Sequence, residues 1–152
     1  MNITSRYSGL TLLVSFLCGC APSEIKPVDI YPEDVCTHCR MAVSDKSFAS
    51  EILTADDEAL KFDDLGCMET YRNDHPDLKI IAVFVSDYET KTWLRHEKSV
   101  IVGTSIATPM GSGRIAVADS ARALEIARKF PPDKPKGANA PKGKADCCWK
   151  DA

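Results

Sequence analysis

The chain has 152 residues, a formal net charge of −3, 27% charged residues and 44% hydrophobic residues. This is the balance of an ordinary soluble domain and not of a disordered or fibrous chain. Its mild acidity argues against a nucleic-acid-binding protein, which would carry a clustered basic face. The unusual feature is sulfur, because the chain holds seven cysteines and four methionines.

The first 19 residues are typical of a secretory signal peptide. A short polar start with Arg6 is followed by the apolar residues 10–17, a stretch too short to cross a bilayer, which needs about 20 apolar residues. We therefore expect residues 1–19 to be removed, so that the mature chain begins at Cys20.

Cys20 ends a segment, Leu17-Cys18-Gly19-Cys20, that resembles a bacterial lipobox. In a lipobox the cysteine that follows a small residue is lipidated and becomes the new N-terminus. We therefore predict lipidation at Cys20 and a periplasm-facing membrane lipoprotein. The residue after it is Ala21 and not Asp, which favours the outer membrane. Plain secretion with cleavage near Cys20 is the alternative.

Proline-rich segments flank the central part of the chain. Residues 20–32 contain three prolines and are predicted to form a tether. Residues 131–152 contain four prolines and five lysines and are predicted to be a disordered tail. The folded domain is therefore expected at residues 33–130.

Hydrophobic periodicity predicts six extended segments and two helices in this domain. The first helix should be capped by Asp63 or Asp64, and the second by Asp119 or Ser120. We expect the second helix to bury Ala121, Leu124, Ala127 and Phe130. In chain order, the elements are strands at 48–53 and 59–62, a helix at 65–73, a strand at 78–85, extended segments at 93–94 and 99–102, a strand at 114–117 and a helix at 121–130.

This order predicts an α+β fold. In each half of the domain a strand is followed by an acidic cap and then a helix. This shared pattern is weak evidence of duplication. The order therefore indicates two related α+β units.

Two thiols and a thioether fall within six residues, Cys36-Thr37-His38-Cys39-Arg40-Met41. Soft thiolate and thioether ligands select Cu(I). On an extended segment Cys39 and Met41 would point to the same face, and Met110, in a glycine-flanked loop, could supply a third sulfur. The sequence therefore predicts a soft-metal site.

Other interpretations of the cysteines remain open. Cys36 and Cys39 could form a redox dithiol or a structural disulfide. A zinc site would need a second pair of ligands, and Cys147-Cys148 is far away in the tail. Cys67 and Met68 fall on the first predicted helix, where buried sulfur residues pack as ordinary apolar groups.

The same residues resemble the NosL family of nitrous oxide reductase accessory lipoproteins. The motifs occur in the family's order over about residues 34–127, and they are Cys36-x-x-Cys39-x-Met41, Phe62-Asp63-Asp64 with Gly66-Cys67-Met68, Asp87-Tyr88 before Trp93, and Thr108-Pro109-Met110-Gly111-Ser112-Gly113.

The resemblance implies a membrane-anchored Cu(I) chaperone that is not an enzyme. It also implies an α+β domain of two small related ββαβ units packed together after the lipidated tether, at about residues 33–86 and 87–130. Its implied partners are a membrane ABC-type Nos assembly machinery and nitrous oxide reductase, or a related copper protein, with no nucleic acid. The implied metal ligands are Cys39, Met41 and Met110, with Cys36 as a participant, whereas Asp63 and Asp64 are expected to cap the helix. A thiol–disulfide oxidoreductase using Cys36 and Cys39, or a metal-free assembly adaptor, are the competing functions.

Overall fold

The structure, a computed structural model, describes residues 24–132. The predicted signal peptide, the lipidation site at Cys20 and the tail cysteines Cys147 and Cys148 lie outside the described residues. No helix within the described part of the chain is long and apolar enough to cross a membrane.

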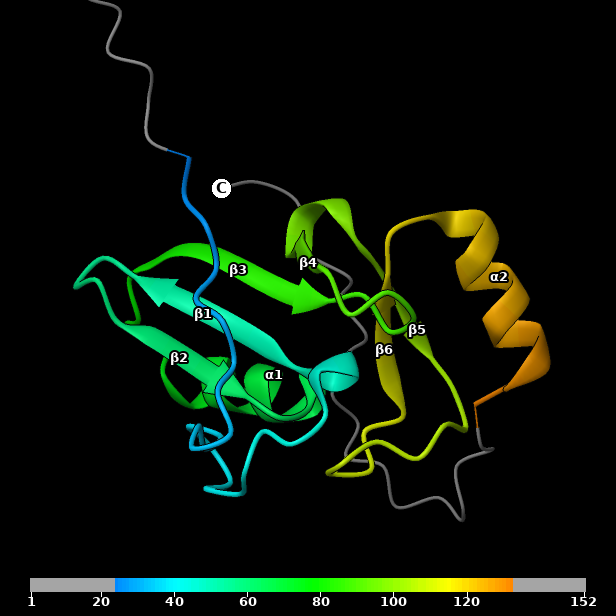
Figure 1. Ribbon diagram of the computed structural model, residues 1–152, viewed down its shortest axis with the longest axis horizontal. Helices are drawn as coiled ribbons and strands as arrows, with labels where there is room; N and C mark the ends of the chain where they lie inside the picture. The colour runs from blue at the N-terminus through cyan, green and yellow to red at the C-terminus, as the bar shows by residue number, and fades with distance from the viewer. Residues whose placement is uncertain (1–23, 133–152) are drawn as a thin grey trace, which may run out of the picture.

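The larger of two sheets is antiparallel, with the strand order β2-β1-β3-β4. Helix α1 packs against one face of this sheet (Figure 1) through Leu65, Cys67 and Met68, which join Ile52 and Phe62 in the core. The elements are β1 (Ser50–Thr54), β2 (Ala59–Phe62), α1 (Leu65–Asp74), β3 (Ile80–Ser86) and β4 (Trp93–Arg95).

The N-terminal segment, residues 24–34, crosses the opposite face of the larger sheet (Figure 1). It covers Glu51, whose Oε1 accepts a hydrogen bond of 2.9 Å from the Val28 N–H. Lys61, on the neighbouring strand, donates to the Asp29 carbonyl at 2.7 Å and to the Asp34 carboxylate at 2.6 Å. Burial raises the pKa of Glu51. Part of the expected tether is therefore bound to the sheet.

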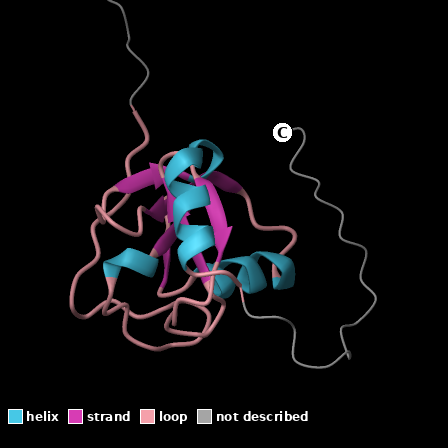
Figure 2. Cartoon of the chain, turned by 90° about the vertical axis from the view of Figure 1, so that its right-hand side faces the viewer, coloured by secondary structure: helices cyan, strands magenta, loops and turns pink. Residues whose placement is uncertain are grey.

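The smaller sheet consists of β5 (Val100–Gly103) and β6 (Arg114–Val117), with α2 (Ser120–Lys129) against it. Figure 2 shows α2 from this side, in front of the strands. Ala123 and Ile126 of the helix pack against Val102, Ile115 and Val117. A 3-10 helix, Lys46–Phe48, precedes β1, and another, His96–Lys98, precedes β5.

Asp87 joins the two sheets at the end of β3. Its backbone pairs with Ala116 of β6, and its buried carboxylate accepts hydrogen bonds of 2.9–3.0 Å from the N–H groups of Glu89, Thr90 and Ala118. Burial alone would raise the pKa of Asp87, but these donors outweigh it and lower the pKa below its ordinary value of 3.8.

The predicted elements are present, with boundaries shifted by at most two residues. The first half has the predicted order, β1-β2-α1-β3. The second half is not a ββαβ unit in the described residues, because β4 extends the larger sheet and no strand follows α2. Pro131 and Pro132 come after Phe130, the residue that ends that helix, and proline cannot donate to a strand ladder.

The buried face of α2 also differs from the prediction. Ala121 and Leu124 are exposed, and Leu124 has 59% of its surface accessible. Ala123 and Ile126 are buried instead, with Ala127 and Phe130 half-buried beside them. Apolar residues at several helical spacings made two faces of this helix plausible, and contact with the smaller sheet selects the one that carries Ile126.

Replacement of Asp87 by Asn should destabilise the protein in a pH-dependent way. The pKa of Asp87 is lowered in the folded state, so its contribution is complete above its ordinary pKa of 3.8 and disappears as the pH falls through the lower folded value. We expect Asp87→Asn to reduce the free energy of unfolding by about 1–3 kcal/mol at pH 7 and by less at pH 3, measured by urea unfolding. Asp56→Asn, at an exposed turn, is the control, and a difference independent of pH would contradict this interpretation.

Candidate metal site

Residues 36–41 form a tight loop. The Cys36 N–H donates to the Met41 carbonyl at 2.7 Å, the Arg40 N–H donates to the Cys36 carbonyl at 3.0 Å, and a backbone bridge between Val35 and Ala42 closes the loop. Arg40 has a φ of 65°, in the left-handed region that few residues other than glycine adopt. The chain therefore turns sharply between its two thiols and its thioether.

This geometry corrects the expectation that Cys39 and Met41 share one face of an extended segment. Cys39 is half-buried, and its thiol donates to the Asp63 carboxylate, with Sγ 3.5 Å from Oδ1 and 3.6 Å from Oδ2. Met41 has 54% of its surface exposed. The two residues therefore lie in different surroundings, one turned towards the protein and the other exposed to solvent.

Four side chains with metal-ligating atoms meet at this loop, namely Cys36, Cys39, Asp63 and Cys67, and their ligand atoms all lie within 4.8 Å of one another. Asp63 is the residue after β2, and Cys67 is in the first turn of α1. Cys36, Asp63 and Cys67 are buried, and all three cysteines are free thiols. We call this group the thiol cluster.

Burial determines the protonation of the two inner thiols. It raises the pKa of Cys36 and, more strongly, that of Cys67, where the neighbouring Cys36, Asp63 and Cys39 raise the pKa further. Both side chains are therefore neutral at pH 7. A metal ion would have to displace their protons, and neither is an activated nucleophile of the kind a thiol–disulfide oxidoreductase uses.

Met110 lies on the loop between β5 and β6. The base of this loop is closed by Thr104, whose N–H and hydroxyl both donate to the Gly113 carbonyl, at 2.7 and 2.9 Å. Gly113 has a φ of 64°, and a Cβ at this position would lie 2.4 Å from the Thr104 carbonyl oxygen. Only glycine fits there. Met110 is exposed over 47% of its surface.

The carboxylate of Asp64 attaches the Met110 loop to the start of α1. It caps the helix by accepting from the Gly66 N–H at 2.7 Å, and it accepts from the Thr108 hydroxyl at 2.6 Å and from the Met110 N–H at 3.0 Å. Burial alone would raise the pKa of Asp64, but the hydrogen bonds, including one from Ser112, lower it. Asp64 is therefore an ionised structural residue.

The structure places the predicted ligands in two groups. Cys36 and Cys39 lie together in the thiol cluster. Met41 and Met110 are exposed on two loops, and the loop of Met110 is fixed to Asp64, next to Asp63 of the cluster. Of the two acidic residues expected to cap the helix, Asp64 does so, whereas Asp63 contacts Cys39.

Cys67 was expected to pack in the core, and it is buried there, as is Met68. Its sulfur also belongs to the thiol cluster, which the sequence interpretation missed. The available signal was its position three residues after the Asp64 cap, because the first turn of a helix that starts beside the cysteine loop brings Cys67 towards that loop.

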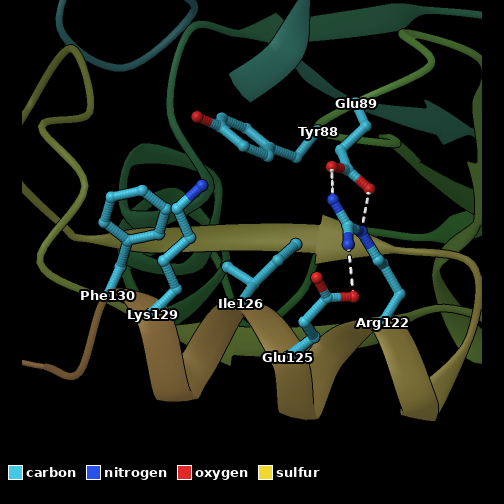
Figure 3. A pocket seen from close by; sticks show the side chains of 7 residues that line it. All are labelled: Tyr88, Glu89, Arg122, Glu125, Ile126, Lys129 and Phe130. Carbon is cyan, nitrogen blue, oxygen red and sulfur yellow. Dashed lines mark hydrogen bonds and ion pairs between the residues drawn. The ribbon is translucent and has the colours of Figure 1, made fainter.

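A hollow of about 240 Å³ lies elsewhere, between α2 and the turn after β3. Figure 3 shows Arg122 paired with Glu89 and Glu125 at one end and Phe130 with Lys129 at the other. None of the predicted metal ligands lines this hollow.

Comparisons with known proteins identify the family and the fold of this domain. The family model described as NosL matches residues 27–130. The crystal structure of the copper chaperone NosL from Shewanella denitrificans is similar at 15% sequence identity with a TM-score of 0.63, covering 71% of this chain and 90% of that one. No curated protein matches the sequence significantly. At that identity the structural likeness shows a shared fold.

Gly66 should be required for the contact between α1 and the Met110 loop. A Cβ at Gly66 would lie 2.7 Å from the Ser112 Cβ. We expect Gly66→Ala to lower the free energy of unfolding by about 1–2 kcal/mol, because overpacking outweighs the gain in helix propensity. Urea unfolding measures this effect.

Gly103→Ala is the matched control, since nothing lies within 4 Å of a Cβ at that position. The loss caused by Gly66→Ala should shrink in a Ser112→Gly background, where the clashing atom is absent. Equal losses for Gly66→Ala and Gly103→Ala would show that the contact is looser than described.

Proposed function

This chain belongs to the NosL family, and we propose that it is a membrane-anchored periplasmic Cu(I) carrier and not an enzyme. The observation that carries the proposal is the thiol cluster, with exposed Met41 on the same loop and exposed Met110 on a loop bound to Asp64, in a domain that matches the family model. Thiolate and thioether donors favour Cu(I), and the fold is shared with a protein described as a copper chaperone.

We propose Cys36, Cys39, Met41 and Met110 as the copper ligands of this carrier. Cys39 is the half-buried member of the cluster, and the two methionines are exposed. An ion bound by few soft ligands at a surface can accept a ligand from a second protein before it leaves the first. The ion would then pass by ligand exchange without being released into solution.

The proposed recipient is the ABC-type Nos assembly machinery that supplies nitrous oxide reductase, or a related copper protein. This follows from the family and from the similar motifs. The competing oxidoreductase function has less support, because Cys36 is completely buried and its pKa is raised, whereas an attacking thiol needs access and a lowered pKa.

Replacement of Cys39 tests copper carriage. The reduced wild-type chain should take one equivalent of Cu(I) from a competing chelator under anaerobic conditions, and Cys39→Ser should lose this tight binding. Leu124→Ala, which alters an exposed apolar residue on α2, should bind as the wild type does. A wild-type chain that takes no Cu(I) but reduces insulin disulfides would instead support the oxidoreductase.

The membrane anchor is tested separately at Cys20. Cells given labelled palmitate should incorporate the label into the wild-type chain and into Cys18→Ser, because only Cys20 occupies the lipidated position of the motif. Cys20→Ser should lose the label and leave the acylated membrane fraction. Retention of label in Cys20→Ser would contradict the lipoprotein assignment.

A further inference from the structure

We propose that Cys67 is a third thiolate ligand, and that Cys36, Cys39 and Cys67 form an inner Cu(I) site behind the exposed methionines. This inference rests on the proposed function, since it concerns where a copper carrier holds its cargo. It assigns a metal-binding role to a core cysteine of α1, which the sequence motif around Cys36 and Cys39 does not include.

The spacing of the three sulfurs fits one ion. An ion about 2.3 Å from each of three sulfurs in a plane holds them about 4 Å apart. The ligand atoms of the thiol cluster already lie within 4.8 Å of one another, so small changes in side-chain torsions would bring the sulfurs into contact with a central ion.

The cluster is fixed from two directions. The Cys36 N–H and carbonyl close the cysteine loop, and the Thr37 N–H donates to the Lys61 carbonyl of β2 at 2.8 Å. Cys67 is fixed by the helix cap at Asp64 and by its place in the core. Three cysteines from two segments, the cysteine loop and α1, are therefore preorganised, which reduces the entropy lost on metal binding.

Burial separates an inner position from an outer one. Cys36 is 0% exposed and Cys67 4%, whereas Met41 is 54% and Met110 47% exposed. Cys39 is half-buried and lies between these extremes. Cys39 would therefore belong to both positions, and exchange of the remaining ligands around it would move the ion between the inner thiolates and the outer thioethers.

The binding step balances as a replacement of protons. Each thiol that bonds to copper through sulfur loses its proton to solvent, so Cu(I) and three thiols give a copper trithiolate and three protons. The copper stays in the +1 state, and no oxidant or reductant takes part. Cys67 lies in the first turn of α1, where the partial positive charge of the helix N-terminus offsets part of the negative charge that develops.

The experiment uses the full chain purified in detergent under anaerobic conditions, with Cys147→Ser and Cys148→Ser removing the tail thiols. After one equivalent of Cu(I) is added, X-ray absorption counts the sulfur donors and a weakly buffered titration counts the released protons. We expect three sulfurs and three protons. Cys67→Ser should lose one of each, and its affinity should fall by more than the roughly 10–100-fold that loss of a supporting contact costs.

Two further variants separate coordination from packing. Met68→Leu alters the buried neighbour of Cys67 on the same helix without removing a thiol, and it should keep three sulfurs and three protons. The Met41→Leu, Met110→Leu double variant removes the two proposed outer ligands, which are exposed. It should keep the three thiolate donors of the inner site but transfer Cu(I) to a chelator more slowly.

The outcomes distinguish this inference from the proposed function. If folded Cys67→Ser binds Cu(I) with unchanged affinity, sulfur count and proton release, the inner site is wrong and copper carriage stands. If Cys67→Ser does not fold, the methionine double variant decides, because a fall below three sulfur donors would overturn the inner site. If the parent chain does not bind Cu(I), both the inner site and the proposed function are wrong.

Discussion

The candidate site depends on one buried carboxylate, that of Asp64. It begins α1 and at the same time binds the backbone and a side chain of the Met110 loop, so a single ionised group joins the larger sheet's helix to a loop of the smaller sheet. In the unfolded chain this carboxylate is hydrogen-bonded to water. The net gain in stability on folding therefore comes from several donors arranged around one acceptor. Together with the ion pair between Arg114 and Glu69 of α1, this connection fixes the Met110 loop relative to the start of the helix that carries Cys67.

Asp87 complements Asp64 at the other side of the contact between the sheets. Both residues are buried aspartates that receive backbone N–H groups from more than one element, and the pKa of each is lowered. The smaller sheet therefore meets the rest of the domain through directional hydrogen bonds as well as apolar packing. This matters for function, because the Met110 loop connects the strands of the smaller sheet whereas the cysteine loop lies next to the larger one. The relative placement of the two loops therefore depends on how the sheets meet.

Much of the fold could be predicted from the sequence because strong local signals mark it. Acidic caps at Asp64 and Asp119 begin both helices, and His75 ends the first one. The second unit was mispredicted because strand periodicity does not say which sheet a short strand such as β4 joins. The choice between the two plausible faces of α2 likewise depends on tertiary packing, which places Ile126 inside and Leu124 outside.

The cysteine loop could be found from its spacing, but its shape could not, because the left-handed Arg40 has no local sequence signal such as glycine. Cys67 is a core residue, as predicted. Its proximity to Cys36 and Cys39 depends on contacts between residues far apart in the sequence, which local patterns do not reveal.

The N-terminal segment of the described chain is bound to the larger sheet. Val28, Asp29 and Asp34 bind Glu51 and Lys61 before the chain reaches Cys36, so mechanical tension applied to the start of the domain reaches the larger sheet before it reaches the cysteine loop.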